Sequence, residues 1–196
     1  LLTLTGSFAI GSGAFSFNYE GEYFKTFDHW DTALKLTAEV PRFVSNFHGL
    51  GNETIRDIDQ FSRDFYRVRR TLLGIYPSFK KRGDGGTTLS IGPALESIKI
   101  EDMDGRIVSN ENPTVNESVF EQRLFTGGNA SFDFYNVDHL AIPTQGLGFN
   151  FGGEWRANID DFERQMLRLD SELKVYVRLG VTDRFVLATR LGAKHI

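Results

Sequence analysis

The sequence contains no cysteine among its 196 residues. That absence excludes disulfide frameworks, thiolate metal sites and cysteine nucleophiles. No apolar run approaches the roughly 20 residues that a membrane-spanning helix requires, so no helical span is expected. Basic residues are outnumbered by acidic ones, and the formal net charge is −4. Because phosphate backbones are bound by basic surfaces, nucleic acid is not an expected partner.

Catalytic and metal-binding motifs are missing as well. The histidines have no spacing typical of metal ligands, and no Gly-x-Ser-x-Gly element is present. Asn52 and Glu53 resemble part of the Gly-Asn-His-Glu element of metallophosphoesterases, but the histidine and its Gly-Asp-x-His partner are absent. Asp102 and Asp104 lack the further oxygen ligands of a calcium loop. The sequence therefore predicts no enzyme, no metal and no cofactor.

Aromatic residues and glycine are plentiful. Aromatic side chains make up 13% of the chain, with 18 Phe, and there are 20 Gly. This composition favours β-strands joined by tight turns over a helical bundle. The length fits one domain, residues 1–196, although composition alone leaves a soluble β protein open.

A two-residue period in polarity runs from Leu167 to Leu179. Successive side chains of a strand point to opposite faces, so the two faces meet different surroundings. A helix would place Arg168, Glu172 and Leu179 on one side, so this segment is predicted to be a strand. The odd positions are Leu167, Leu169, Ser171, Leu173, Val175, Val177 and Leu179, and the even ones are Arg168, Asp170, Glu172, Lys174, Tyr176 and Arg178.

The same period predicts about nine strands in all. Leu72 and Leu73 are adjacent, and Arg70 falls on an otherwise apolar register. That break predicts a bulge, or a strand end outside any membrane. The alternation is clear at 15–23 and 34–40, and further candidate strands are 1–10, 63–81, 87–100, 130–138, 146–157 and 184–194.

Strand length and loop length favour a membrane. Several predicted strands exceed the 5 to 6 residues usual in soluble proteins and reach the roughly 9 to 11 that a tilted membrane strand needs. Short turns alternate with longer loops such as 46–62 and 101–129, as in an up-and-down outer-membrane barrel. The predicted lumen-facing residues are Glu20, Glu22, Arg67, Arg69, Arg168, Asp170, Glu172 and Lys174, and the predicted lipid-facing ones are Phe15, Phe17, Leu169, Leu173, Val175 and Val177.

Two short motifs add specificity. One is a loop with the sequence GLGNET; the other is a strand ending in Asn-Val-Asp followed by a Pro-Thr-x-Gly turn. Pro143 fixes φ where the chain reverses, and Gly146 permits a conformation that other residues resist. The motif residues are Gly49, Leu50, Gly51, Asn52, Glu53 and Thr54 in the loop, and Asp138, Pro143, Thr144 and Gly146 in the turn.

This order of motifs resembles the barrel of the BamA/TamA superfamily of outer-membrane insertases and translocases, which includes bacterial surface antigens. The turn departs from the family's frequent Arg before the glycine, where this chain has Gln145. The GLGNET loop looks like the version of this loop found in the Bacteroidetes branch. Barrels of that branch are often fused to a phosphoesterase-like or patatin-like domain. The resemblance implies an all-β, antiparallel up-and-down transmembrane β-barrel, of which this chain holds about nine of roughly sixteen strands.

The resemblance also implies location and partners. We expect the outer membrane of a Gram-negative bacterium, with outer-membrane lipid, the remainder of the barrel or other envelope proteins as partners. The implied role is the insertion or translocation of proteins or other envelope components. Two alternatives stay open: a passive outer-membrane channel, and a soluble β-barrel that binds a small apolar ligand.

Overall fold

A computed structural model describes residues 1–11, 13–48, 57, 59–109, 117–180 and 185–196. It forms one antiparallel sheet of nine strands whose order follows the chain, so the predicted all-β up-and-down fold class is confirmed. Among the described residues, no helix is long and apolar enough to cross a membrane. The strands are β1 (Leu2–Ala9), β2 (Ala14–Phe27), β3 (Trp30–Asn46), β4 (Arg67–Arg82), β5 (Thr87–Ile100), β6 (Arg123–Val137), β7 (Gly146–Asn158), β8 (Gln165–Arg178) and β9 (Val186–His195).

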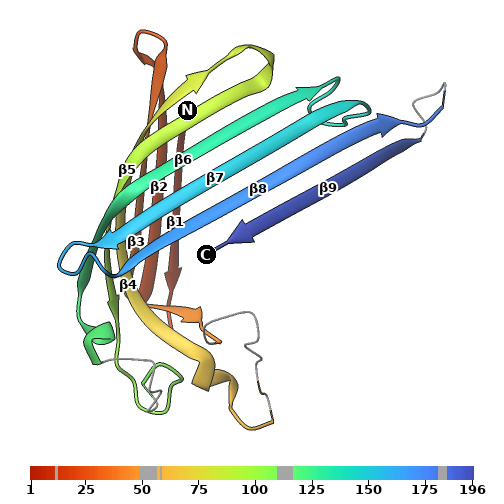
Figure 1. Cartoon of the computed structure of the whole chain (residues 1–196). Helices are drawn as coiled ribbons and strands as arrows, with labels where there is room; N and C mark the ends of the chain where they lie inside the picture. The colour runs from red at the N-terminus through yellow and green to blue at the C-terminus, as the bar shows by residue number, and fades with distance from the viewer. Residues whose placement is uncertain (12, 49–56, 58, 110–116, 181–184) are drawn as a thin grey trace.

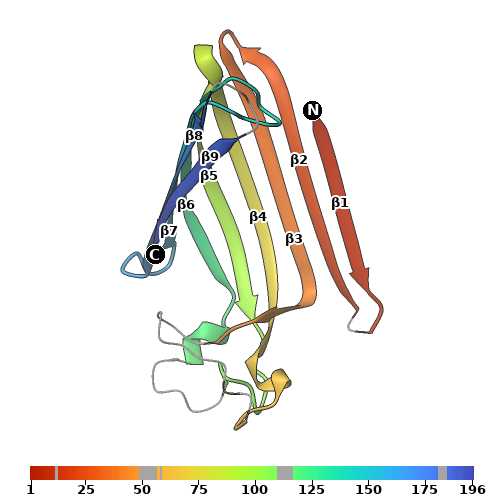
Figure 2. The same cartoon turned by 90° about the vertical axis from the view of Figure 1, so that its right-hand side faces the viewer.

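The sheet curves into an open trough. One wall is made of β1 to β3 and the other of β6 to β9, and β4 and β5 lie along the bend between them (Figures 1 and 2). β1 and β9 form the two edges, and each pairs with a single neighbour among the described strands. The structure is therefore a segment of barrel wall, consistent with the predicted partial barrel.

The connections sort to two ends of the trough. One end, the turn end, carries the β2–β3, β4–β5, β6–β7 and β8–β9 connections; the other, the loop end, carries the rest (Figure 1). The longest connections, at 47–66 and 101–122, both lie at the loop end, as expected for an outer-membrane barrel. The predicted loop of Gly49 to Thr54 lies outside the described residues.

Several strands are longer than a bilayer requires. β3 has 17 residues and β4 has 16, against roughly 9 to 11 for a tilted membrane strand. Their pairing shifts register between Glu39 and Phe43. Pro41 lies in this irregular stretch, where a residue without an N–H costs no ladder hydrogen bond. The bulge predicted near Leu72 thus lies opposite it, on β3.

A small aromatic cluster lies at the loop end, around Tyr66. Tyr66 is 4% exposed and ends a short 3₁₀ turn, Arg63–Tyr66. Its ring contacts those of Phe61, Phe65 and His48. The Tyr66 hydroxyl accepts a hydrogen bond from the Asp57 N–H at 2.8 Å. These contacts tie the start of β4 to the loop that precedes it.

The sheet has almost no apolar core. The buried apolar residues among those described are Ala14, Tyr66, Val68, Ala94, Val108 and Ala157. Large apolar side chains are instead exposed along the strands, Leu167 at 49% and Ile75 at 48%. A contiguous apolar surface of this extent marks an interaction with membrane or protein.

Candidate functional site

The register divides the sheet into an inner and an outer face. The inner face is the concave one: a hollow of about 350 Å³ is lined by residues of β2 to β7, among them Asn18, Tyr76, Asn129 and Arg156. Side chains alternate between the faces along each strand. On the outer face the exposed apolar side chains include Leu2, Leu4, Phe15, Leu73, Ile75, Phe79, Leu89, Ile91, Leu95, Leu124, Leu147, Phe151, Trp155, Leu167 and Val177.

The predicted lipid-facing and lumen-facing residues of β2 and β8 lie on opposite faces of the sheet, as their alternation predicts. Phe15, Phe17, Leu169, Leu173, Val175 and Val177 share the outer face. Glu20, Glu22, Arg168, Asp170, Glu172 and Lys174 share the inner face. We propose that the outer face contacts lipid and that the inner face lines a lumen.

The register of β4 puts Arg67 and Arg69 on the outer face, and not on the inner face predicted for them. Uninterrupted pairing of β4 with β5 from Arg70 to Ile75 puts Arg69 on the side of Leu73. Arg70 lies on the inner face instead, and its Nη2 is 2.8 Å from Glu39 Oε2. Leu72 caused the error, since it is an apolar residue on the inner face of β4 and so inverts the apparent pattern there.

Arg156 stands at the centre of the inner face. It is only 6% exposed, and its Nε donates to Glu96 Oε1 at 2.6 Å. Its Nη2 donates to Asn129 Oδ1 at 2.8 Å, and its guanidinium lies 5.8 Å from the centre of the Tyr76 ring. The cluster joins β4, β5, β6 and β7, and this set of partners satisfies a cation that would otherwise be costly to bury.

The sequence did not identify this cluster. Glu96 and Arg156 are 60 residues apart in the chain. Arg156 also follows a glycine-rich stretch, which weakens the local alternation. The available signal was a single charge at an inner position of β5, Glu96, and two charges at inner positions of β7, Glu154 and Arg156; only the register shows that Glu96 meets Arg156.

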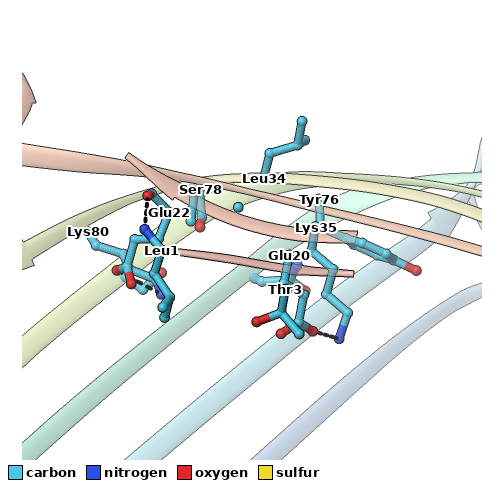
Figure 3. A pocket seen from close by; sticks show the side chains of 13 residues that line it. Leu1, Thr3, Glu20, Glu22, Leu34, Lys35, Tyr76, Ser78 and Lys80 are labelled. Atoms are coloured by element: carbon cyan, nitrogen blue, oxygen red, sulfur yellow. Dashed lines mark hydrogen bonds and ion pairs between the residues drawn. The ribbon is translucent and has the colours of Figure 1, made fainter. Parts of the chain in front are cut away.

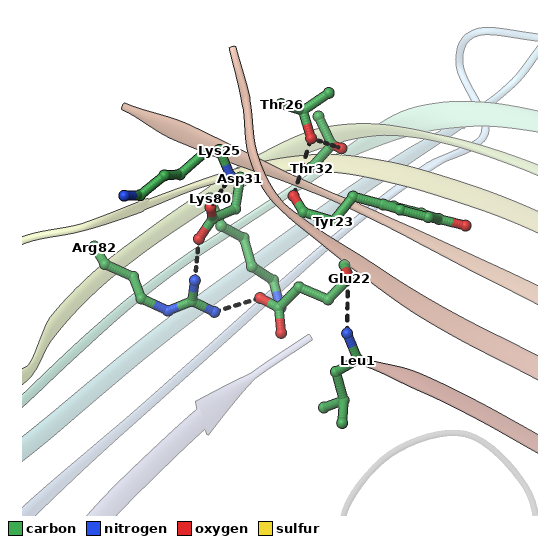
Figure 4. A network of polar contacts seen from close by, with 9 residues as sticks. All are labelled: Leu1, Glu22, Tyr23, Lys25, Thr26, Asp31, Thr32, Lys80 and Arg82. Carbon is green, nitrogen blue, oxygen red and sulfur yellow. Dashed lines mark hydrogen bonds and ion pairs between the residues drawn. The ribbon is translucent and has the colours of Figure 1, made fainter. Parts of the chain in front are cut away.

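A second charged cluster lies at the turn end. The guanidinium of Arg82 bridges the carboxylates of Glu22 and Asp31, and Lys80 Nζ lies 3.3 Å from Glu22 Oε1 (Figure 4). The Lys25 N–H donates to Asp31 Oδ1 at 2.7 Å. Both carboxylates are nearly buried, with side-chain exposures of 15% and 11%. The cluster therefore holds the ends of β2, β3 and β4 together.

Further ion pairs cover the rest of the inner face. Lys35 Nζ and Glu20 Oε1 are 3.3 Å apart over a hollow of about 400 Å³ lined by β1 to β6 (Figure 3). On the other wall Glu172 is paired with Lys174 and with Arg190 of β9. Opposite charges alternate across the strands, so the face is strongly polar yet carries no large field of one sign.

Asp138 organises the β6–β7 turn. Its Oδ1 accepts hydrogen bonds from the backbone N–H groups of Thr144 at 2.9 Å, Gln145 at 3.1 Å and His139 at 3.0 Å. Its Oδ2 accepts one from the Thr144 hydroxyl. The Thr144 hydroxyl and these backbone donors hold the pKa of Asp138 well below its ordinary value. The predicted turn motif is thus a carboxylate-centred structure.

Gly146 ends that turn in a conformation that needs glycine. Its φ is +129°, and a Cβ built there would lie 2.2 Å from the Asn136 carbonyl oxygen. Arg178 of the neighbouring strand donates to Thr144 Oγ1 at 3.0 Å. The Asp138, Thr144 and Gly146 positions are therefore brought together. Pro143 lies between them, in the turn itself.

The family model of the Omp85 superfamily domain matches residues 3–196. The chain belongs to the Omp85 superfamily. Comparison with curated proteins gave no match, and comparison with solved structures gave none either. The resemblance to BamA/TamA-like barrels is confirmed at the level of this superfamily.

Omp85 membership carries a general role. Proteins of this superfamily reside in the outer membrane of Gram-negative bacteria and serve protein insertion or translocation. Its members work with the membrane and with other envelope proteins, and the superfamily is one of insertion and transport proteins, not of enzymes. The assignment to the Bacteroidetes branch stays a prediction.

Proposed function

We propose that this Omp85 chain is a wall segment of an outer-membrane barrel that inserts or translocates proteins or other envelope components. The observation that carries the proposal is the consistent separation of the two sheet faces. Away from the start of β4, where Arg67 and Arg69 lie on the convex side, the exposed large apolar side chains gather on the convex side of the strands and the ion pairs on the concave side. A sheet so arranged is stable with lipid outside and water inside.

Edge geometry supports a wall rather than a complete barrel. The meander is antiparallel throughout, so β1 and β9 run in the same direction. Joining these edges directly would require one parallel pair. Closure by antiparallel pairing alone requires an odd number of additional strands, from the remainder of the barrel or from another envelope protein.

The inner face disfavours a soluble barrel for an apolar ligand and a channel selective for one sign of charge. A soluble barrel that binds an apolar ligand needs apolar side chains on the concave side, where this sheet has Glu22, Lys35, Glu96 and Arg156. A channel selective for ions of one sign can be built from rings of one charge, whereas here each described cluster mixes both signs. A lumen of compensated charges suits a wall past which polypeptide can move without strong adhesion.

The role is tested by reconstituting the full protein into proteoliposomes and adding an unfolded outer-membrane protein. Insertion is measured as protease protection of that substrate. We expect protection to develop faster than in empty liposomes and in liposomes with a porin of similar size. Equal rates in all three preparations would contradict the insertion role. Rapid passage of small solutes in that case would favour the passive channel.

A further inference from the structure

Two prolines face each other in the middle of the sheet. β4 and β5 pair from Arg70 with Ile100 to Ile75 with Leu95, and pairing resumes at Phe79 with Ile91. The register is the same on both sides of this interruption, so Pro77 of β4 lies directly opposite Pro93 of β5. Neither residue has an N–H to donate across the strands.

The interruption is confined to this one seam. β4 stays paired with β3 through Leu34 and Pro77. β5 stays paired with β6 through Pro93 and Gly128. Since the far sides are intact, the missing donors of both prolines are directed at each other. We call the facing stretches, residues 76–78 and 92–94, the proline seam.

Gly92 shows how closely the strands approach there. A Cβ built on Gly92 would lie 2.0 Å from the Pro77 carbonyl oxygen and 2.6 Å from Ser78 Cα. No side chain larger than hydrogen fits that space. The backbones of the two strands therefore approach closely at the seam, although the regular pairing that joins the strands elsewhere is interrupted there.

The seam lies inside the apolar band of the outer face. The exposed side chains that flank it there are Ile75, Phe79, Ile91 and Leu95. Lipid supplies no hydrogen bonds in place of the missing ones. Proline is ordinarily confined to edge strands, whereas β4 and β5 are central. Figure 1 shows both strands along the bend of the trough.

We infer that the proline seam is a hinge at which the barrel wall changes its curvature. β4 and β5 lie close together over residues 76–78 and 92–94 but part transiently there as the curvature changes, and the pairs on either side hold the strands in register. The hinge lies between β4 and β5, along the bend that connects the wall of β1 to β3 with the wall of β6 to β9. This inference concerns the wall itself and holds whatever cargo the protein handles.

Amide hydrogen exchange on the full protein in lipid nanodiscs tests the hinge. Donor direction alternates along a strand, so Ile75, Phe79, Ile91 and Leu95 direct their N–H groups across the same seam as the prolines. We expect these amides to exchange at least about tenfold faster than the amides of the β6–β7 ladder, which is uninterrupted from Phe125 to Val137. Equal protection of the two ladders would overturn the inference.

Variants test whether the missing proline N–H groups cause the fast exchange of the flanking amides. Pro77→Val combined with Pro93→Val supplies the missing donors and should slow exchange of the flanking amides by at least about fivefold. Gly92→Ala should accelerate it, because the new methyl group separates the strands. Gly128→Ala is the matched control, since its Cβ would meet only the Gly92 carbonyl oxygen at 3.5 Å. Flanking exchange that is unchanged in the double variant, or raised equally by both alanines, would overturn the inference.

Discussion

Arg156 on β7 and Glu96 on β5 form an ion pair, 2.6 Å from Nε to Oε1, across the intervening strand β6. Their side chains are 7% and 15% exposed, so this is the least exposed ion pair on the inner face in the part of the chain that the structure describes. It acts as a clamp that fixes the relative positions of three strands. Its burial distinguishes it from the ordinary surface pairs elsewhere in the sheet.

Removal of one partner of this pair should be costly. Glu96→Gln leaves the Arg156 guanidinium nearly buried without its carboxylate, and we expect the free energy of unfolding to fall by about 3 kcal/mol. The measurement is reversible urea unfolding in detergent micelles.

The control for this variant is Glu20→Gln. The Glu20–Lys35 pair is 58% and 53% exposed on its two side chains, so its loss should cost less than about 0.5 kcal/mol. Equal effects of the two substitutions would show that burial does not set the strength of the inner-face pairs.

The Asp138 turn should resist acid. The folded-state pKa of Asp138 is depressed by the Thr144 hydroxyl and by backbone donors. Its contribution to stability is therefore complete above the unfolded value, near 3.9, and is lost only as pH falls from there through the lower folded value. We expect the carboxylate to remain ionised at pH 3, as measured by NMR titration of its carbon resonance. Titration near pH 4 would contradict the geometry of the turn.

Gly146→Ala should destabilise the β6–β7 hairpin. A methyl group there would meet the Asn136 carbonyl oxygen, and alanine disfavours a φ of +129°. We expect a loss of about 1 to 3 kcal/mol in detergent unfolding. Gly153→Ala on the same strand is the comparison, because its Cβ would meet only the Leu169 side chain at 3.4 Å. A similar loss in both would mean that the backbone at Gly146 is not the cause.

Local pattern was sufficient for most of the fold. In β8 the alternation is regular from Leu167 to Arg178, because one face is apolar except at Ser171 and the other is charged except at Tyr176. β6 was harder: the structure begins it at Arg123, whereas the prediction began at 130. Gly127 and Gly128 have low strand propensity. Pairing with β5 and β7 on both sides overrides that preference.

The inner face could be predicted only in part. Glu20, Glu22 and the β8 charges follow from alternation within one strand. The position of Arg70, and not Arg69, on the inner face depends on the register between strands, which a single sequence does not specify. The contact of Glu96 with Arg156 depends on it as well. Pro77 and Pro93 are visible in the sequence, yet their opposition becomes apparent only when β4 and β5 are paired.

The assignment of the two faces to lipid and lumen is tested most directly at the neighbouring residues Leu173 and Lys174 of β8. Leu173→Cys and Lys174→Cys are prepared in the full protein, reconstituted in lipid vesicles and labelled with a small fluorescent maleimide. We predict that the label at position 173 is quenched by brominated lipid, whereas the label at position 174 is quenched only by aqueous iodide. Lipid quenching at position 174 with iodide quenching at position 173 would reverse the two faces and contradict the account.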